Sequence, residues 1–129
     1  MNINFEAAIR YINIGESEQA IKELKEAIRS EIANNSENIS IQYRCVLGEL
    51  LHDLQRDDEA AKEFKKVIDY CKRTGSLPNQ EKIAEEFLKA INGNITITAE
   101  QLNIPGSTEL MSMPVQNNST PKKVSRRKK

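Results

Sequence analysis

Apolar side chains recur every three or four residues through the first 91 residues, a spacing typical of amphipathic helices. Breaks near Gly15, Asn34–Ser36, Asp57, Gly75–Pro78 and Gly93 divide this pattern into five segments. Their apolar faces comprise, in chain order, Ala8, Tyr11 and Ile12; Ala20, Leu24, Ala27 and Ile28; Ile39, Tyr43, Leu47, Leu50, Leu51 and Leu54; Ala60, Phe64, Val67, Ile68 and Cys71; and Ile83, Ala84, Phe87, Leu88 and Ile91. The sequence therefore predicts five helices joined by short turns, an all-α stack.

Side chains at three of the breaks are suited to capping the helices that follow them. Ser17, Ser36 and Asp57 precede the second, third and fourth helices, and such residues accept hydrogen bonds from the free backbone N–H groups of a first helical turn. We therefore expect these three residues to act as N-caps.

The helical pattern repeats after forty residues. A shift of that length lays Ala20 on Ala60, Leu24 on Phe64 and Ala27 on Val67. Self-similarity at a fixed period predicts a solenoid of helical hairpins. Small residues would let the antiparallel helices approach closely where they cross, and these are Ala8, Ala20, Gly48 and Ala60.

The repeated positions carry a known pattern. L47-G48-x2-L51 followed by A60-x3-F64-x2-V67 resembles the tetratricopeptide repeat, and A20-x3-L24-x2-A27 is a partial second match. The resemblance covers about residues 2–93 and implies a helical-hairpin solenoid of two repeats plus a terminal helix. The forty-residue period is similar to the kinesin light chain type. Asn4 and Arg44 stand where the family usually has a bulky aromatic residue, and the closing proline is missing from both repeats.

The resemblance implies a non-catalytic protein–protein interaction adaptor or scaffold whose partner binds the first helix of each pair. On that basis the groove face includes Glu49, His52, Asp53 and Glu85. The first helix is apolar around much of its circumference, and one stripe is enough to dock it on the second. Phe5, Ile9 and Ile12 are then surplus apolar surface for a partner helix or for self-association. Two repeats fall short of the usual three, so we expect homo-oligomers.

Nothing in the sequence predicts catalysis. His52, the one histidine, lies beside Asp53, but adjacent helical residues point in different directions, so we interpret His52 as the partner of Glu49 in a surface ion pair. Cys45 and Cys71 are interpreted as small core hydrophobes. We expect no enzyme activity, no cofactor and no metal. The N-terminal sequence lacks a secretory pattern and no stretch is long enough to span a membrane, which favours a cytoplasmic protein.

Charge and composition divide the chain into three parts. Residues 1–93 form the helical domain, 94–106 a short turn in which Thr98 caps Ala99–Leu102, and 107–129 a disordered tail rich in polar residues. The 19 basic and 19 acidic residues balance over the whole chain. Residues 1–91, however, carry 13 basic and 17 acidic side chains, and the last eight residues carry six cations. An acidic body is therefore joined to a basic end.

The basic end permits several interpretations. Its six cations suit a phosphate backbone, so the alternative function is a nucleic-acid-associated accessory protein; these residues are Lys122, Lys123, Arg126, Arg127, Lys128 and Lys129. The same cluster suits anionic lipid heads, resembles a nuclear import signal, or serves only to keep the protein in solution. A further hypothesis is that the tail folds back on the acidic body.

Overall fold

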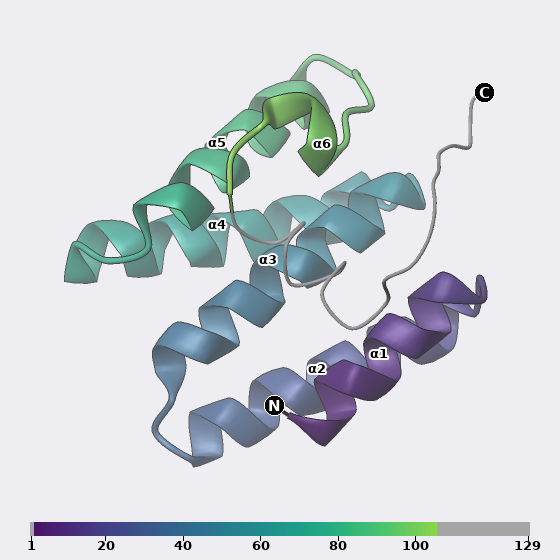
Figure 1. Cartoon of the computed structure of the whole chain (residues 1–129). Helices are drawn as coiled ribbons and strands as arrows, with labels where there is room; N and C mark the ends of the chain where they lie inside the picture. Colours follow the sequence, from purple (N-terminus) through teal and green to yellow (C-terminus); the bar gives the residue numbers. More distant parts are fainter. Residues whose placement is uncertain (1, 106–129) are drawn as a thin grey trace.

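The computed structural model describes residues 2–105, in which every regular element is a helix (Figure 1). The six helices are α1 (Ile3–Asn13), α2 (Ser17–Ala33), α3 (Glu37–Asp53), α4 (Asp57–Thr74), α5 (Pro78–Asn92) and the single turn α6 (Ala99–Leu102). The all-α class and the consecutive hairpins expected from the sequence are confirmed. The tail expected to be disordered, residues 107–129, lies outside the described residues.

The helices pack mainly against their neighbours in the sequence. α1 pairs with α2 and α3 with α4, while α2 against α3 and α4 against α5 join the pairs into one stack (Figure 1). α6 contacts α5, in the place and with the capped form that the sequence predicts. Successive antiparallel packing brings the start of α1, the end of α2 and the start of α3 to the same end of the stack.

The helices α1, α2, α3 and α5 end in the same type of turn. The N–H groups of Glu16, Ser36, Arg56 and Ile95 each donate to the carbonyl oxygen five residues earlier, all at 2.8 Å. The residue before each donor has a positive φ, and these residues are Gly15, Asn35, Gln55 and Asn94. This is the bond that closes a helix with a left-handed residue. After the turn that ends α5, residues 95–97 continue without regular structure.

The predicted caps are partly wrong. Ser36 is the N-cap of α3, but its side chain makes no capping hydrogen bond. Ser17 and Asp57 are the first helical residues of α2 and α4, so the residues before them occupy the cap positions. The physical reason is clear for Asp57, whose carboxylate is hydrogen-bonded to the buried ring of His52.

Small residues lie at the tight crossing of α3 and α4, as the repeat predicts. A Cβ atom built on Gly48 would lie 2.8 Å from the ring of Phe64, so only glycine fits without displacing that ring. The Phe64 ring is fully buried and stacks on Phe87 with 4.9 Å between ring centroids. The close approach at Gly48 and the stacked rings of Phe64 and Phe87 therefore hold α3, α4 and α5 together.

Candidate functional site

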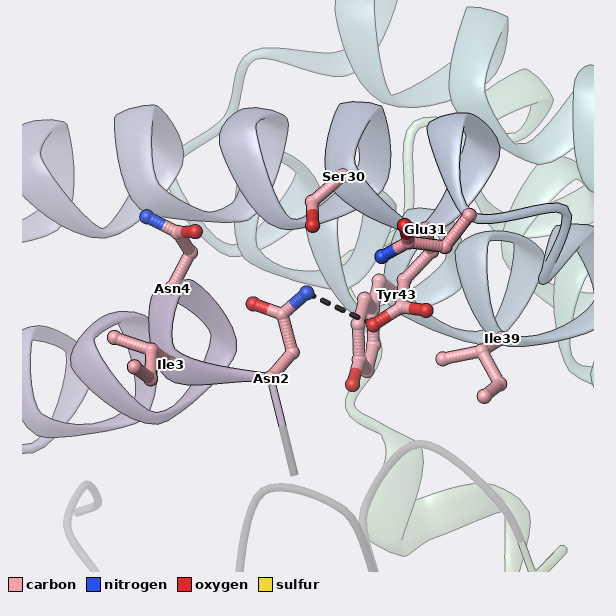
Figure 2. Close-up of a pocket in the computed structure, with 8 residues that line it drawn as sticks. Asn2, Ile3, Asn4, Ser30, Glu31, Ile39 and Tyr43 are labelled. Carbon is pink, nitrogen blue, oxygen red and sulfur yellow. Dashed lines mark hydrogen bonds between the residues drawn. The ribbon is translucent and has the colours of Figure 1, made fainter.

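A pocket opens where the first hairpin meets the second, at the end of the stack that holds the N-termini of α1 and α3. Its volume is about 500 Å³. Figure 2 shows α1, α2 and α3 each contributing side chains to it. The lining residues are Asn2, Ile3, Asn4, Ser30, Glu31, Asn34, Ile39 and Tyr43.

Asn2 holds one wall of this pocket in place. Its side-chain oxygen accepts the backbone N–H of Phe5 at 3.0 Å, which caps α1. Its amide nitrogen donates to Oε2 of Glu31 at 2.8 Å, the contact drawn in Figure 2. Two residues on, Asn4 donates to Glu23 of α2 at 2.9 Å. The two asparagines therefore fix the start of α1 against α2.

Two isoleucines leave apolar surface at the mouth. Ile3 is 78% exposed and Ile39 is 40% exposed, although both belong to regular helices. Between them lies Tyr43, whose ring is buried and stacks on Phe5 at a centroid distance of 4.2 Å. The pocket thus combines exposed aliphatic groups with a buried aromatic floor.

The electrostatic environment of the pocket is acidic. Burial raises the pKa of the Tyr43 phenol above its ordinary value, and the negative charges of Glu31 and then Glu6 raise it further. A hydrogen bond with the Asn2 backbone opposes this rise in the pKa. Among the residues that line the pocket, Glu31 is the one with a charged side chain.

The raised pKa of Tyr43 predicts alkaline sensitivity. The folded state favours the neutral phenol, so this stabilisation is present below the unfolded-state pKa of about 10 and is lost as pH rises through the higher folded-state value. Urea unfolding followed against pH should show stability falling above about pH 10. Tyr43→Phe should reduce that fall. A Tyr43→Phe curve that falls as steeply as that of the unchanged chain would contradict the assignment.

The C-terminal end of α3, which carries His52, is covered by the segment that follows α5. His52 is 1% exposed, and its Nδ1 lies 2.8 Å from Oδ1 of Asp57. Its Nε2 accepts the backbone N–H of Ile97 at 3.1 Å. The ring also meets Phe87 edge-on at 5.4 Å. Since Nε2 is the acceptor, the neutral ring carries its proton on Nδ1 and donates it to Asp57.

The segment that His52 holds runs from Ile95 to Pro105. Ile97, Leu102 and Ile104 pack against the core. Thr98 and Gln101 form a reciprocal capping box around α6, with the Thr98 N–H donating to Gln101 at 2.8 Å. The resemblance places His52 on the groove face that binds a partner. In the structure this part of α3 is instead covered by residues 95–105 of the same chain.

The structure changes the interpretation of four predicted contact residues. Phe5 is fully buried and Ile9 is 2% exposed, so the expectation that they are surplus surface is wrong. Phe5 packs on Tyr43 of the next hairpin, a contact that docking α1 on α2 alone does not anticipate. Glu49 is also buried. The surface ion pair expected of His52 is wrong because that ring is buried and bonded to Asp57 and Ile97.

The other predicted residues differ in accessibility. Asp53 and Glu85 are exposed, and Ile12 is partly buried. Cys45 and Cys71 are buried, as expected of core residues. Lys122, Lys123, Arg126, Arg127, Lys128 and Lys129 lie outside the described residues.

The pocket residues were only partly visible in the sequence. Ile39 and Tyr43 belong to the predicted apolar face of the third helix, but periodicity does not show that Ile39 stays half-exposed. Glu31 and Asn2 meet across two helices, 29 positions apart, so no local pattern could pair them.

Four further observations concern the described residues and the likeness of the chain to known proteins. Between residues 2 and 105 no cluster of His, Cys, Asp and Glu could hold a metal ion. No helix there is long and apolar enough to cross a membrane. Residues 41–74, which cover most of α3 and all of α4, match the family model described as tetratricopeptide repeat. No curated protein and no solved structure matches the chain.

Proposed function

We propose, from the premise that this chain is a tetratricopeptide-like helical repeat protein, that it acts as a non-catalytic adaptor that binds a peptide segment of another protein. The observation that carries the proposal is the pocket between the two hairpins. It offers exposed aliphatic surface at Ile3 and Ile39 beside the polar side chains of Asn2, Asn4 and Glu31.

An extended peptide suits this combination. An apolar side chain of the peptide would cover Ile3 and Ile39, and its N–H groups would find acceptors in the side chains of Glu31 and Asn4. The pocket is small, so this contact alone gives a weak, reversible complex. We keep three predicted residues as further partner contacts outside the pocket: Asp53, Glu85 and Ile12. Four predicted residues are buried and would instead support the shape of the binding surface: Phe5, Ile9, Glu49 and His52.

Three finer proposals accompany this role. The forty-residue spacing between the starts of α2 and α4 supports a long-repeat subtype like the kinesin light chain type. The low number of cysteines, two in the whole chain, supports a cytoplasmic setting, where thiols stay reduced. Self-association is supported by the small number of hairpins.

The pocket is tested by paired substitutions in the full chain. Ile3→Asp with Ile39→Asp should remove the specific partner from an affinity capture analysed by mass spectrometry, because two charges then replace the apolar surface. Ile14→Asp with Ile95→Asp is the matched control, since these isoleucines are 70% and 58% exposed and do not line the pocket.

Circular dichroism should show that both double variants remain helical. Any protein retained by the control and lost by the pocket variant is then a partner of the pocket. A set of captured proteins that is the same for both variants would place the contact elsewhere and sink the proposal.

A further inference from the structure

We propose that residues 122–129 of this chain, KKVSRRKK, bind in the pocket between the first two hairpins of the same molecule. The proposal goes beyond the adaptor function and does not need a partner peptide to exist. It makes the basic end an intramolecular ligand.

Charge complementarity is the first argument. The pocket is lined by the carboxylate of Glu31 and by no basic side chain among the described residues. Glu6 adds a second carboxylate close enough to raise the pKa of Tyr43 together with Glu31. Residues 1–91 carry 17 acidic and 13 basic residues, whereas residues 122–129 carry six basic residues and no acidic one. The most basic segment of the chain thus complements its acidic part.

The order of residues in the segment is the second argument. Val124 is flanked by Lys122 and Lys123 on one side and, after one serine, by Arg126 and Arg127 on the other. The pocket combines aliphatic surface at its mouth with the carboxylate of Glu31, and Glu6 lies near enough to affect Tyr43. Val124 would cover the exposed isoleucines while the neighbouring cations approach Glu31 and Glu6.

The length of the connection is the third argument. Lys122 lies 17 positions after Pro105, the last described residue, so sixteen residues lie between them. At roughly 3.4 Å per position, these 17 steps span up to about 58 Å. A compact domain of this size has a radius of gyration of about 13 Å. The segment can therefore reach the pocket of its own molecule.

Such binding would have a consequence for the adaptor. A partner peptide would have to displace the segment, so the affinity for partners would depend on ionic strength and on any change that removes charge from the tail.

A spin label tests the proposal on the full chain. Ser125→Cys supplies an attachment site for a nitroxide, since the two native cysteines are buried. If the segment binds as proposed, the amide NMR signals of Ile3, Ile39 and Tyr43 lose most of their intensity at low salt. Glu31→Lys should restore those signals. Glu16→Lys, at the opposite end of α2, makes the same change in net charge and should not restore them.

Three outcomes would overturn the proposal. Unchanged signals around the pocket, with salt-sensitive binding of a mixed-sequence DNA duplex by the full chain, would favour the phosphate-backbone role of the tail. Signal loss that appears only between a labelled copy and a separate isotope-enriched copy would assign the contact to two molecules. If Glu16→Lys restored the amide signals as fully as Glu31→Lys, the signal loss would depend on net charge and not on the pocket. Failure of partner capture by the adaptor leaves the spin-label result intact, so the two proposals can fail separately.

Discussion

Replacing Gly48 with leucine should lower the free energy of unfolding by about 3 kcal/mol, the upper end of the usual cost of overpacking. The Cβ atom alone would lie 2.8 Å from the Phe64 ring. That ring cannot withdraw, because it is fully buried and stacked on Phe87. The leucine would therefore force α3 and α4 apart. Urea denaturation followed by circular dichroism measures the loss.

Gly93→Leu is the matched control for this experiment. Gly93 is exposed, has a φ of −94° and would bring a Cβ no closer than 3.5 Å to its neighbours. We expect a change of well under 1 kcal/mol there. Combining Gly48→Ala with Phe64→Leu should recover part of the stability lost by Gly48→Ala alone, since the shorter side chain vacates the ring position. Equal losses for the two glycines would contradict the close packing of α3 on α4.

His52→Ala should cost about 2–3 kcal/mol of stability and release the segment from Ile95 to Pro105. The substitution leaves the partly buried Ile97 N–H without its acceptor and removes the ring that contacts Phe87. Hydrogen exchange measured by mass spectrometry should show a larger increase of exchange in that segment than in α1.

Asp53→Ala tests whether this effect is specific to the buried ring. Asp53 is the next residue of the same helix, but it is exposed. Its substitution should leave both stability and the exchange of the segment nearly unchanged. If His52→Ala lowered stability without altering exchange between Ile95 and Pro105, the hydrogen bond to Ile97 would not be what holds the segment.

Local patterns were sufficient for the helices and their pairing. The period of apolar residues predicts the helices, and the forty-residue shift relates α2 to α4. Thr98, a good N-cap residue, predicts the capped turn over Ala99–Leu102. These features depend on residues close together in the chain, so periodicity and capping chemistry are sufficient to predict them.

The candidate site was predicted less well, because exposure depends on what lies across from each residue. Phe5 was assigned to the surface since α2 alone could not cover it, but Tyr43, from the next hairpin, does. His52 was assigned to a local pair, but its two partners come from the start of α4 and from a segment 45 residues away. No one-dimensional pattern encodes which segment covers which face.

The sequence by itself determined the helical class, the repeat and the separation of an acidic body from a basic end, because these follow from spacing and composition. Only the tertiary structure decided which apolar residues are core and which are surface. It buried Phe5 and His52, left Ile3 and Ile39 exposed, and brought Asn2 to Glu31. Burial is a property of contacts between distant segments, and those contacts arise only when the hairpins stack.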